Sequence, residues 1–144
     1  MNRFPSRTTG LLMLAVGVTG ILALFTLILF FVGLFQSIGS LSSLGSLNDA
    51  LNALTGILSA VLASVLHPAL RRPGLLMSVW AGAIAITFGS WLIVSGRSDV
   101  QLSSYYFFLG NGLIGIWLWM LNRIVRQQAA WPPGLTRWGM VAGA

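Results

Sequence analysis

The sequence predicts an all-α, polytopic transmembrane helical bundle with four spans, and three observations favour it. Of its 144 residues, 56% are hydrophobic and 7% are charged, with a mean hydropathy of +0.88, whereas about a quarter of a typical soluble domain is charged. The stretch from Leu11 to Gln36 has no charge, and about twenty apolar residues suffice to cross a bilayer. The few charges lie in the gaps between apolar runs. Residues 1–144 therefore form a single integral-membrane domain.

The predicted spans are separated where Arg, Asp, Pro or Ser/Gly runs interrupt the apolar sequence. The first contains seventeen Leu, Ile, Val or Phe residues, which favour insertion by roughly 5 to 10 kcal/mol. The second contains eight such residues together with several polar ones, so it depends on its neighbours for insertion. The four spans cover about 11–36, 50–66, 74–95 and 104–122.

The connections between the spans also follow from composition. Pro68 and Pro73 bracket Arg71 and Arg72, and because proline lacks the amide that continues a helix, they predict a tight turn between spans two and three. These two spans should be antiparallel neighbours. The linker 37–49 is rich in Ser and Gly but carries an apolar residue at every third position, which fits either a flexible spacer or a short interfacial helical turn.

The arginines predict the orientation in the membrane. Arg97, offset by Asp99, is the one arginine on the predicted outer side, and seven lie on the other side. By the positive-inside rule both termini are cytoplasmic, in the inner membrane of a prokaryote. Aromatic residues at the predicted ends agree, with Trp80, Trp117, Trp119 and Trp131 towards the cytoplasm and Trp91, Tyr105 and Tyr106 outside. The arginines expected to set topology and to meet lipid headgroups are Arg3, Arg7, Arg71, Arg72, Arg123 and Arg126, followed by Arg137.

Small residues predict how the helices pack, because close backbone approach supplies much of the packing energy in lipid. We expect Gly56, Ala60 and Ser64 of span two to meet Ala81, Ala85 and Gly89 of span three. Span two also carries a Leu/Val stripe with the alternating three-and-four spacing of left-handed helix packing. The stripe comprises Leu44, Leu47, Leu51, Leu54, Leu58, Val61 and Val65, and further close contacts are expected at Gly17, Gly20, Gly112 and Gly115.

The sequence offers little reactive chemistry. It has no Cys, one His and no ionisable residue at the middle of a span, whereas proton relays and ion paths use such residues. It contains no nucleophile and base set and no phosphate-binding loop. We therefore expect no enzyme activity and no cofactor. Nucleic-acid binding is not expected either, since the arginines do not form a patch on a polar surface.

A few polar residues within the spans are candidate sites. Asn111, about two turns into span four, is expected to form an interhelical hydrogen bond to Ser90, Thr87 or another hydroxyl, with ligand binding as the alternative. Asn122, at the cytoplasmic end, is expected to be solvated. His67 could bind a haem or pigment metal, although its place beside Pro68 favours an interfacial role. A transporter would need the polar residues to face one another around a cavity, and these are Asn111, Thr87, Ser90, Thr55 and Ser59.

The C-terminal segment WPPGLTRWGMVAGA begins with a helix-breaking proline pair and continues with a new apolar run. It suggests the start of a fifth helix after residue 133, with the rest of that span absent. Its Leu-x-Arg-Trp opening resembles a segment of uncharacterised bacterial multi-pass membrane proteins. That resemblance implies a longer chain of five or six spans and supplies no activity or site.

These patterns favour a structural function. We expect an accessory or assembly subunit of a membrane protein complex, whose partners are the lipid bilayer and either other membrane subunits or a second copy. One alternative is a small oligomeric transporter or channel for a neutral or hydrophobic solute. The other is a pigment- or haem-associated subunit that uses His67.

Overall fold

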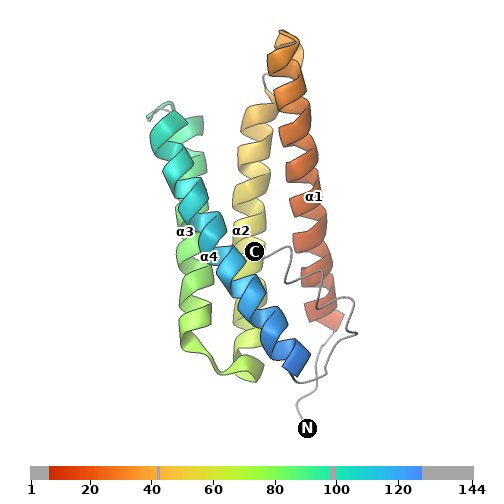
Figure 1. Ribbon diagram of the computed structural model, residues 1–144, viewed down its shortest axis with the longest axis vertical. Coiled ribbons are helices and arrows are strands. Elements are labelled where there is room, and N and C mark those ends of the chain that lie inside the picture. The colour runs from red at the N-terminus through yellow and green to blue at the C-terminus, as the bar shows by residue number, and fades with distance from the viewer. Residues whose placement is uncertain (1–6, 42, 98–99, 128–144) are drawn as a thin grey trace.

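The computed structural model describes residues 7–41, 43–97 and 100–127, and these fold into four long helices that run alternately up and down (Figure 1). Each is long and apolar enough to cross a membrane: Arg7–Phe35, Leu44–Pro68, Pro73–Val94 and Gln101–Ile124. The all-helical class and the four predicted spans are confirmed. The chain is a multi-pass membrane protein.

The first helix, α1 (Arg7–Phe35), is followed by a single 3₁₀ turn, η1 (Gly39–Leu41). The second helix, α2 (Leu44–Leu70), begins soon after, so the linker is mostly helical and is not a loose spacer. Helix α2 also runs through Pro68 to Leu70, past its predicted end at 66. Proline removes one backbone hydrogen bond, and so close to the terminus that loss does not stop the helix.

The turn between α2 and α3 consists of Arg71 and Arg72. Arg71 adopts the left-handed conformation with φ 49°, and its N–H donates to the His67 carbonyl at 2.8 Å, which closes α2. The third helix, α3 (Pro73–Val94), starts directly with proline at its first position, where the missing N–H costs nothing. The tight antiparallel connection between spans two and three is confirmed. The fourth helix, α4, covers Val100–Gln127.

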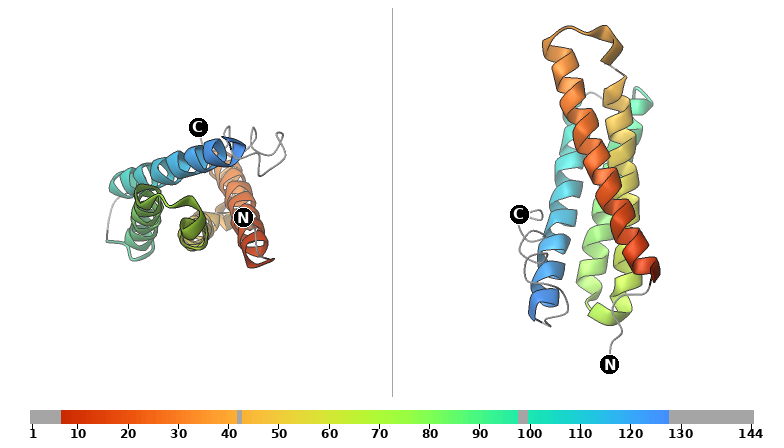
Figure 2. Two further views of the ribbon diagram at one scale, coloured as in Figure 1. Left: turned by 90° about the horizontal axis from the view of Figure 1, so that it is seen from below. Right: turned by 90° about the vertical axis from the view of Figure 1, so that its right-hand side faces the viewer.

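The best-packed region lies in the half of the bundle nearest the Arg71 turn, where α4 crosses in front of α2 (Figure 1). There Trp117 of α4 is 1% exposed and packs with Val79 of α3 and Ala60 of α2. The side chain of Trp117, which the sequence places towards the cytoplasmic interface, thus faces the inside of the bundle. Helix α1 packs on α2 and η1 at one side of the bundle (Figure 2).

The small face of α2 packs on α3 as expected, but it meets a different face of that helix. Ala60 is fully buried, and a Cβ built on Gly56 would lie 3.4 Å from the Cα of Ala83. Ala81, in contrast, is exposed, and Gly89 packs on α4. The expected meeting with span two is therefore wrong for Ala81 and Gly89, because Ala81 is exposed and Gly89 faces α4; Ala85 is buried.

Helices α3 and α4 make their closest approach at Gly82 and Gly110. A Cβ built on Gly110 would lie 2.7 Å from the Gly82 carbonyl oxygen and 2.5 Å from Cγ1 of Ile86. Both glycines are buried. The expected contacts at Gly17, Gly20 and Gly112 are not formed, since a Cβ at each would meet no atom within 4 Å. Glycine is thus required at 110 and tolerated at the open positions.

We predict that Gly110→Ala destabilises the bundle by about 1 to 3 kcal/mol, the usual cost of forcing extra atoms into a packed interface. The matched control is Gly17→Ala, where the new methyl group enters open space and helix propensity improves by up to about 1 kcal/mol. Unfolding by SDS in mixed micelles, followed by far-ultraviolet circular dichroism, measures both. Equal stability of the two variants would contradict the close approach of α3 and α4.

Candidate functional site

Side chains of α3 and α2 link these two helices by hydrogen bonds. The Ser90 hydroxyl of α3 donates to the Asp49 carbonyl of α2 at 2.9 Å, and the Trp80 indole N–H donates to the Ser64 hydroxyl at 3.1 Å. Both fasten α3 to α2, one near each end of the pair. Ser64 also donates to the Ala60 carbonyl of its own helix, so its hydroxyl serves both helices. These bonds fix the register of the two antiparallel spans.

The five polar residues that could have lined a transport path have separate surroundings. Thr55 and Ser59 donate to carbonyls of their own helix, those of Leu51 and Thr55 respectively. Ser90 binds α2, and the hydroxyl of Thr87 is buried without a hydrogen-bond partner. Asn111 is exposed. The structure therefore does not bring the five residues together around one cavity.

Buried polar atoms that sequence reasoning missed lie in the half of the bundle opposite the Arg71 turn. Asn48 Oδ1 and Ser103 Oγ are buried and, like the Thr87 hydroxyl, have no partner within the described part of the chain. Ser103 is fully buried, where α4 packs on Gly89. No spacing or motif marks these two residues in the sequence. Only the fold reveals their burial.

Asn111 does not make the interhelical hydrogen bond expected of it. Its side-chain amide donates to the Phe107 carbonyl, one turn back in α4, at 2.9 Å. The side chain is exposed, because the neighbouring Gly110 takes the position that packs on α3. Asn111 is ten residues beyond Gln101, the start of the candidate membrane span in α4, and at about 1.5 Å per residue this corresponds to roughly half the thickness of a hydrocarbon layer. An amide thus faces outward in the middle part of an apolar helix.

The residues around Asn111 form a surface of α4 that we call the Asn111 face, defined as Phe108, Asn111, Gly112 and Gly115. Phe108 is 77% exposed, and a Cβ on Gly112 would meet no atom within 4 Å. Gly115 is half-buried. Residues four apart lie one above the other on a helix, so a large apolar side chain, an amide and two glycines share this face. It combines a polar group with room for close approach.

His67 and Asn122 lie near the Arg71 turn. His67 is half-buried in the last turn of α2, where its backbone carbonyl accepts the bond that closes the helix. Within residues 7–41, 43–97 and 100–127, no group of three His, Asp or Glu side chains could hold a metal ion. Asn122 is 4% exposed and donates to the Leu118 carbonyl at 2.8 Å. The prediction that Asn122 is solvated is wrong, because α4 turns this position into the bundle.

Five arginines gather at one end of the bundle, where α1 begins, α2 turns into α3 and α4 ends (Figure 1). The Arg123 guanidinium lies 5.5 Å from the ring centre of Trp119. At the other end, Arg97 lies 4.9 Å from Trp91. The described arginines of the first end are Arg7, Arg71, Arg72, Arg123 and Arg126, and Arg3 and Trp131 lie outside the described residues.

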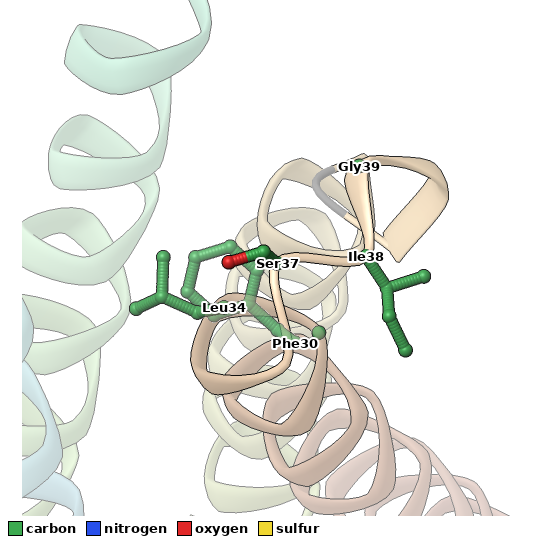
Figure 3. Close-up of a pocket in the computed structure, with 6 residues that line it drawn as sticks. Phe30, Leu34, Ser37, Ile38 and Gly39 are labelled. Carbon is green, nitrogen blue, oxygen red and sulfur yellow. The ribbon is translucent and has the colours of Figure 1, made fainter.

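A hollow of about 290 Å³ lies at the far end of α1, beside η1 (Figure 3). Phe30 and Leu34 contribute apolar side chains, Ser37 contributes a hydroxyl, and Ile38 points away from them in this view. Ser37 has φ 55° and turns the chain out of the helix. A single hydroxyl among apolar side chains supplies no acid, base or nucleophile pair, so this hollow does not suggest catalysis.

Comparisons with known proteins identify no relative: no family model, no curated protein and no solved structure matches the chain. The C-terminal segment that carries the resemblance to multi-pass membrane proteins lies outside the described residues, as does the predicted start of a fifth helix. The candidate sites thus depend on geometry and chemistry alone.

We predict that Ser90→Ala lowers the free energy of unfolding by about 0.5 to 1.5 kcal/mol, because it removes the hydrogen bond from α3 to the Asp49 carbonyl. Ser59→Ala is the control, since Ser59 is equally buried and donates within its own helix. SDS unfolding in mixed micelles measures both. If Ser59→Ala lowers the free energy of unfolding as much as Ser90→Ala, the hydrogen bond from Ser90 to α2 does not stabilise the bundle.

Proposed function

We propose that this protein is an accessory or assembly subunit of a membrane protein complex and that it associates through the Asn111 face of α4. The proposal depends on one observation: an exposed amide in the middle part of α4 lies beside Gly112, whose open side no other part of the described chain covers. No residue of the proposed interface has a chemical function. Its role is to hold helices together.

The free-energy cost of an unpaired amide in lipid favours a partner helix at the Asn111 face. An amide in hydrocarbon has unmet hydrogen-bonding capacity, and the transfer of an unpaired polar group costs several kcal/mol. The bond to the Phe107 carbonyl uses one amide hydrogen, and the second hydrogen and most of the oxygen's capacity remain. A helix that packs over Gly112 and Gly115 could approach closely enough to bind both. Interhelical hydrogen bonds of this kind contribute about 0.6 to 2 kcal/mol.

The uneven burial of the four helices also supports an assembly role. Of the apolar window of α3, 44% is buried, compared with 17% in α1 and in α4. The Leu/Val stripe of α2 is partly exposed as well, with Leu47 and Leu54 more than 40% exposed. Lipid can cover apolar side chains without cost, so these apolar surfaces are compatible with a partner but do not require one. The polar Asn111 is what favours one.

We further propose that the arginine-bearing end faces the cytoplasm of a prokaryotic cell, because basic residues near span ends are retained there. In this orientation α1 starts and α4 ends on the cytoplasmic side.

We predict that a photoreactive benzophenone attached at position 112 forms an adduct with a protein in native membranes. The chain has no cysteine, so Gly112→Cys gives a unique attachment point. Adding Asn111→Leu should reduce the adduct about three- to thirtyfold, which corresponds to the loss of one interhelical hydrogen bond. Asn111→Gln should retain much of it. The mass of the adduct distinguishes a second copy from another subunit.

Ile84→Cys is the matched control for this experiment. Ile84 is 64% exposed and lies in the middle of α3, but it has no amide or glycine face beside it. Label at 84 should react mainly with lipid. Protein adducts of equal yield at 84 and 112, or an adduct that is insensitive to Asn111→Leu, would refute an association through the Asn111 face.

We predict that reporters fused to the two ends of the chain both have cytoplasmic activity. Green fluorescent protein should fluoresce at either end, while alkaline phosphatase should be active only when inserted beside Gly96, between α3 and α4. Replacing Arg71 and Arg72 by Gln should weaken this preference, since fewer basic residues then retain that turn in the cytoplasm. Opposite locations of the two ends would contradict the proposed orientation.

A further inference from the structure

The arginine-bearing end contains a second hollow, of about 390 Å³, between the start of α3 and the last turns of α4. Arg72, Pro73 and Gly74 form its polar end, and Ile116 and Met120 form an apolar wall. Ile116 is 54% exposed, and a Cβ on Gly74 would meet no atom within 4 Å. The hollow is therefore open to the surroundings of the bundle, and its size is within the range of about 300 to 1,000 Å³ usual for ligand sites.

The polar end of this hollow favours a negative charge. Arg72 is exposed, and within residues 7–41, 43–97 and 100–127 the sole carboxylate side chain is that of Asp49, in the second turn of α2 at the opposite end of the bundle. Arg72 has no acidic partner among these residues. The hollow also faces the N-terminus of α3, where the helix dipole is positive. Pro73 has no N–H, and the N–H groups of Leu75 and Leu76 donate to the Arg72 carbonyl, so the Gly74 N–H is the one left for an anion. An anion placed there would meet this N–H and the Arg72 guanidinium.

The depth of the lining residues in the membrane indicates whether a lipid or a soluble anion fits the hollow. Arg72 lies in the turn at the end of the spans, at the level of lipid headgroups, whereas Met120 and Ile116 lie progressively deeper in the apolar window of α4. A molecule that fills the hollow therefore carries its charge at the membrane surface and an apolar chain directed inward. A soluble phosphate or a nucleotide would leave the apolar wall uncovered.

The turn next to the hollow carries a second positive charge. Arg71, adjacent to Arg72 in the chain, holds a left-handed conformation with φ 49°, although glycine is the usual residue at this position of a helix end.

We propose that this hollow, lined by Arg72, Gly74, Ile116 and Met120, binds one anionic phospholipid, with its phosphodiester at Arg72 and the start of α3 and an acyl chain along α4. The guanidinium and the Gly74 N–H donate to phosphate oxygens. Ile116 and Met120 replace part of the bulk lipid that would otherwise surround that acyl chain. None of these four residues belongs to the Asn111 face, which Ile116 adjoins at Gly112.

Native mass spectrometry of the full chain in mild detergent, titrated with dioleoylphosphatidylglycerol, tests this proposal. We expect one lipid to bind about tenfold more tightly than dioleoylphosphatidylcholine, as a charge-assisted contact to phosphate predicts when the competing headgroup carries its own cation. Arg72→Gln should remove most of that preference. Arg126→Gln, which removes an equal charge at the same end but outside the hollow, should change it less than twofold.

Two further measurements separate a lipid site from simpler explanations. Ile116→Trp fills the apolar wall and leaves Arg72 intact, so it should weaken phosphatidylglycerol binding about as much as Arg72→Gln. Glycerol 3-phosphate, which has the charge without acyl chains, should not compete. Equal effects of Arg72→Gln and Arg126→Gln would overturn the proposal in favour of diffuse attraction, and competition by glycerol 3-phosphate would overturn it in favour of a soluble anion. Circular dichroism verifies that each variant keeps its helices.

Discussion

The arrangement of the helices depends on close backbone approach at small residues. In lipid the hydrophobic effect does not drive one apolar helix against another, so van der Waals contact and hydrogen bonds must do so. The contact of Gly82 with Gly110 joins α3 to α4, and that of Gly56 with Ala83 joins α2 to α3. The two contacts use different sides of α3, which places this helix between its neighbours and explains why it is the most buried of the four.

The need for close backbone approach also bears on the glycines that contact no other helix. Glycine in a helix interior costs up to about 1 kcal/mol relative to alanine in water, and a close contact is the usual compensation. Gly110 has that compensation inside the bundle, whereas Gly112, two residues later, faces outward beside an exposed amide. A single turn of α4 thus carries one contact inside the bundle, at Gly110, and one exposed surface, at Asn111 and Gly112.

Composition and charge predicted the spans because both reflect the bilayer directly. Apolar length identified all four helices, and Pro73 with its paired arginines identified the tight turn. Periodicity could not determine which neighbour each small face would meet, because Ala81, Ala85 and Gly89 lie on a helix that packs on both sides. For the same reason Asn122 was expected in solvent and is buried, while Asn111 was expected to bind another helix and is exposed. Which side of a helix faces its neighbours depends on tertiary contacts, and local sequence patterns do not determine these contacts.

The two proposed contacts lie on neighbouring parts of α4. At about 100° per residue, Ile116 is separated by about 140° around the helix from Asn111 but by only about 40° from Gly112, so a lipid along Ile116 would lie beside the glycine side of the Asn111 face. They also differ in depth, since Asn111 lies near the membrane centre and the headgroup end of the hollow is at Arg72. A lipid held at Arg72 and Ile116 would contact both α3 and α4, between the Arg71 turn and the contact of Gly82 with Gly110. Such a lipid would stabilise the packing of α4, the helix that presents the Asn111 face.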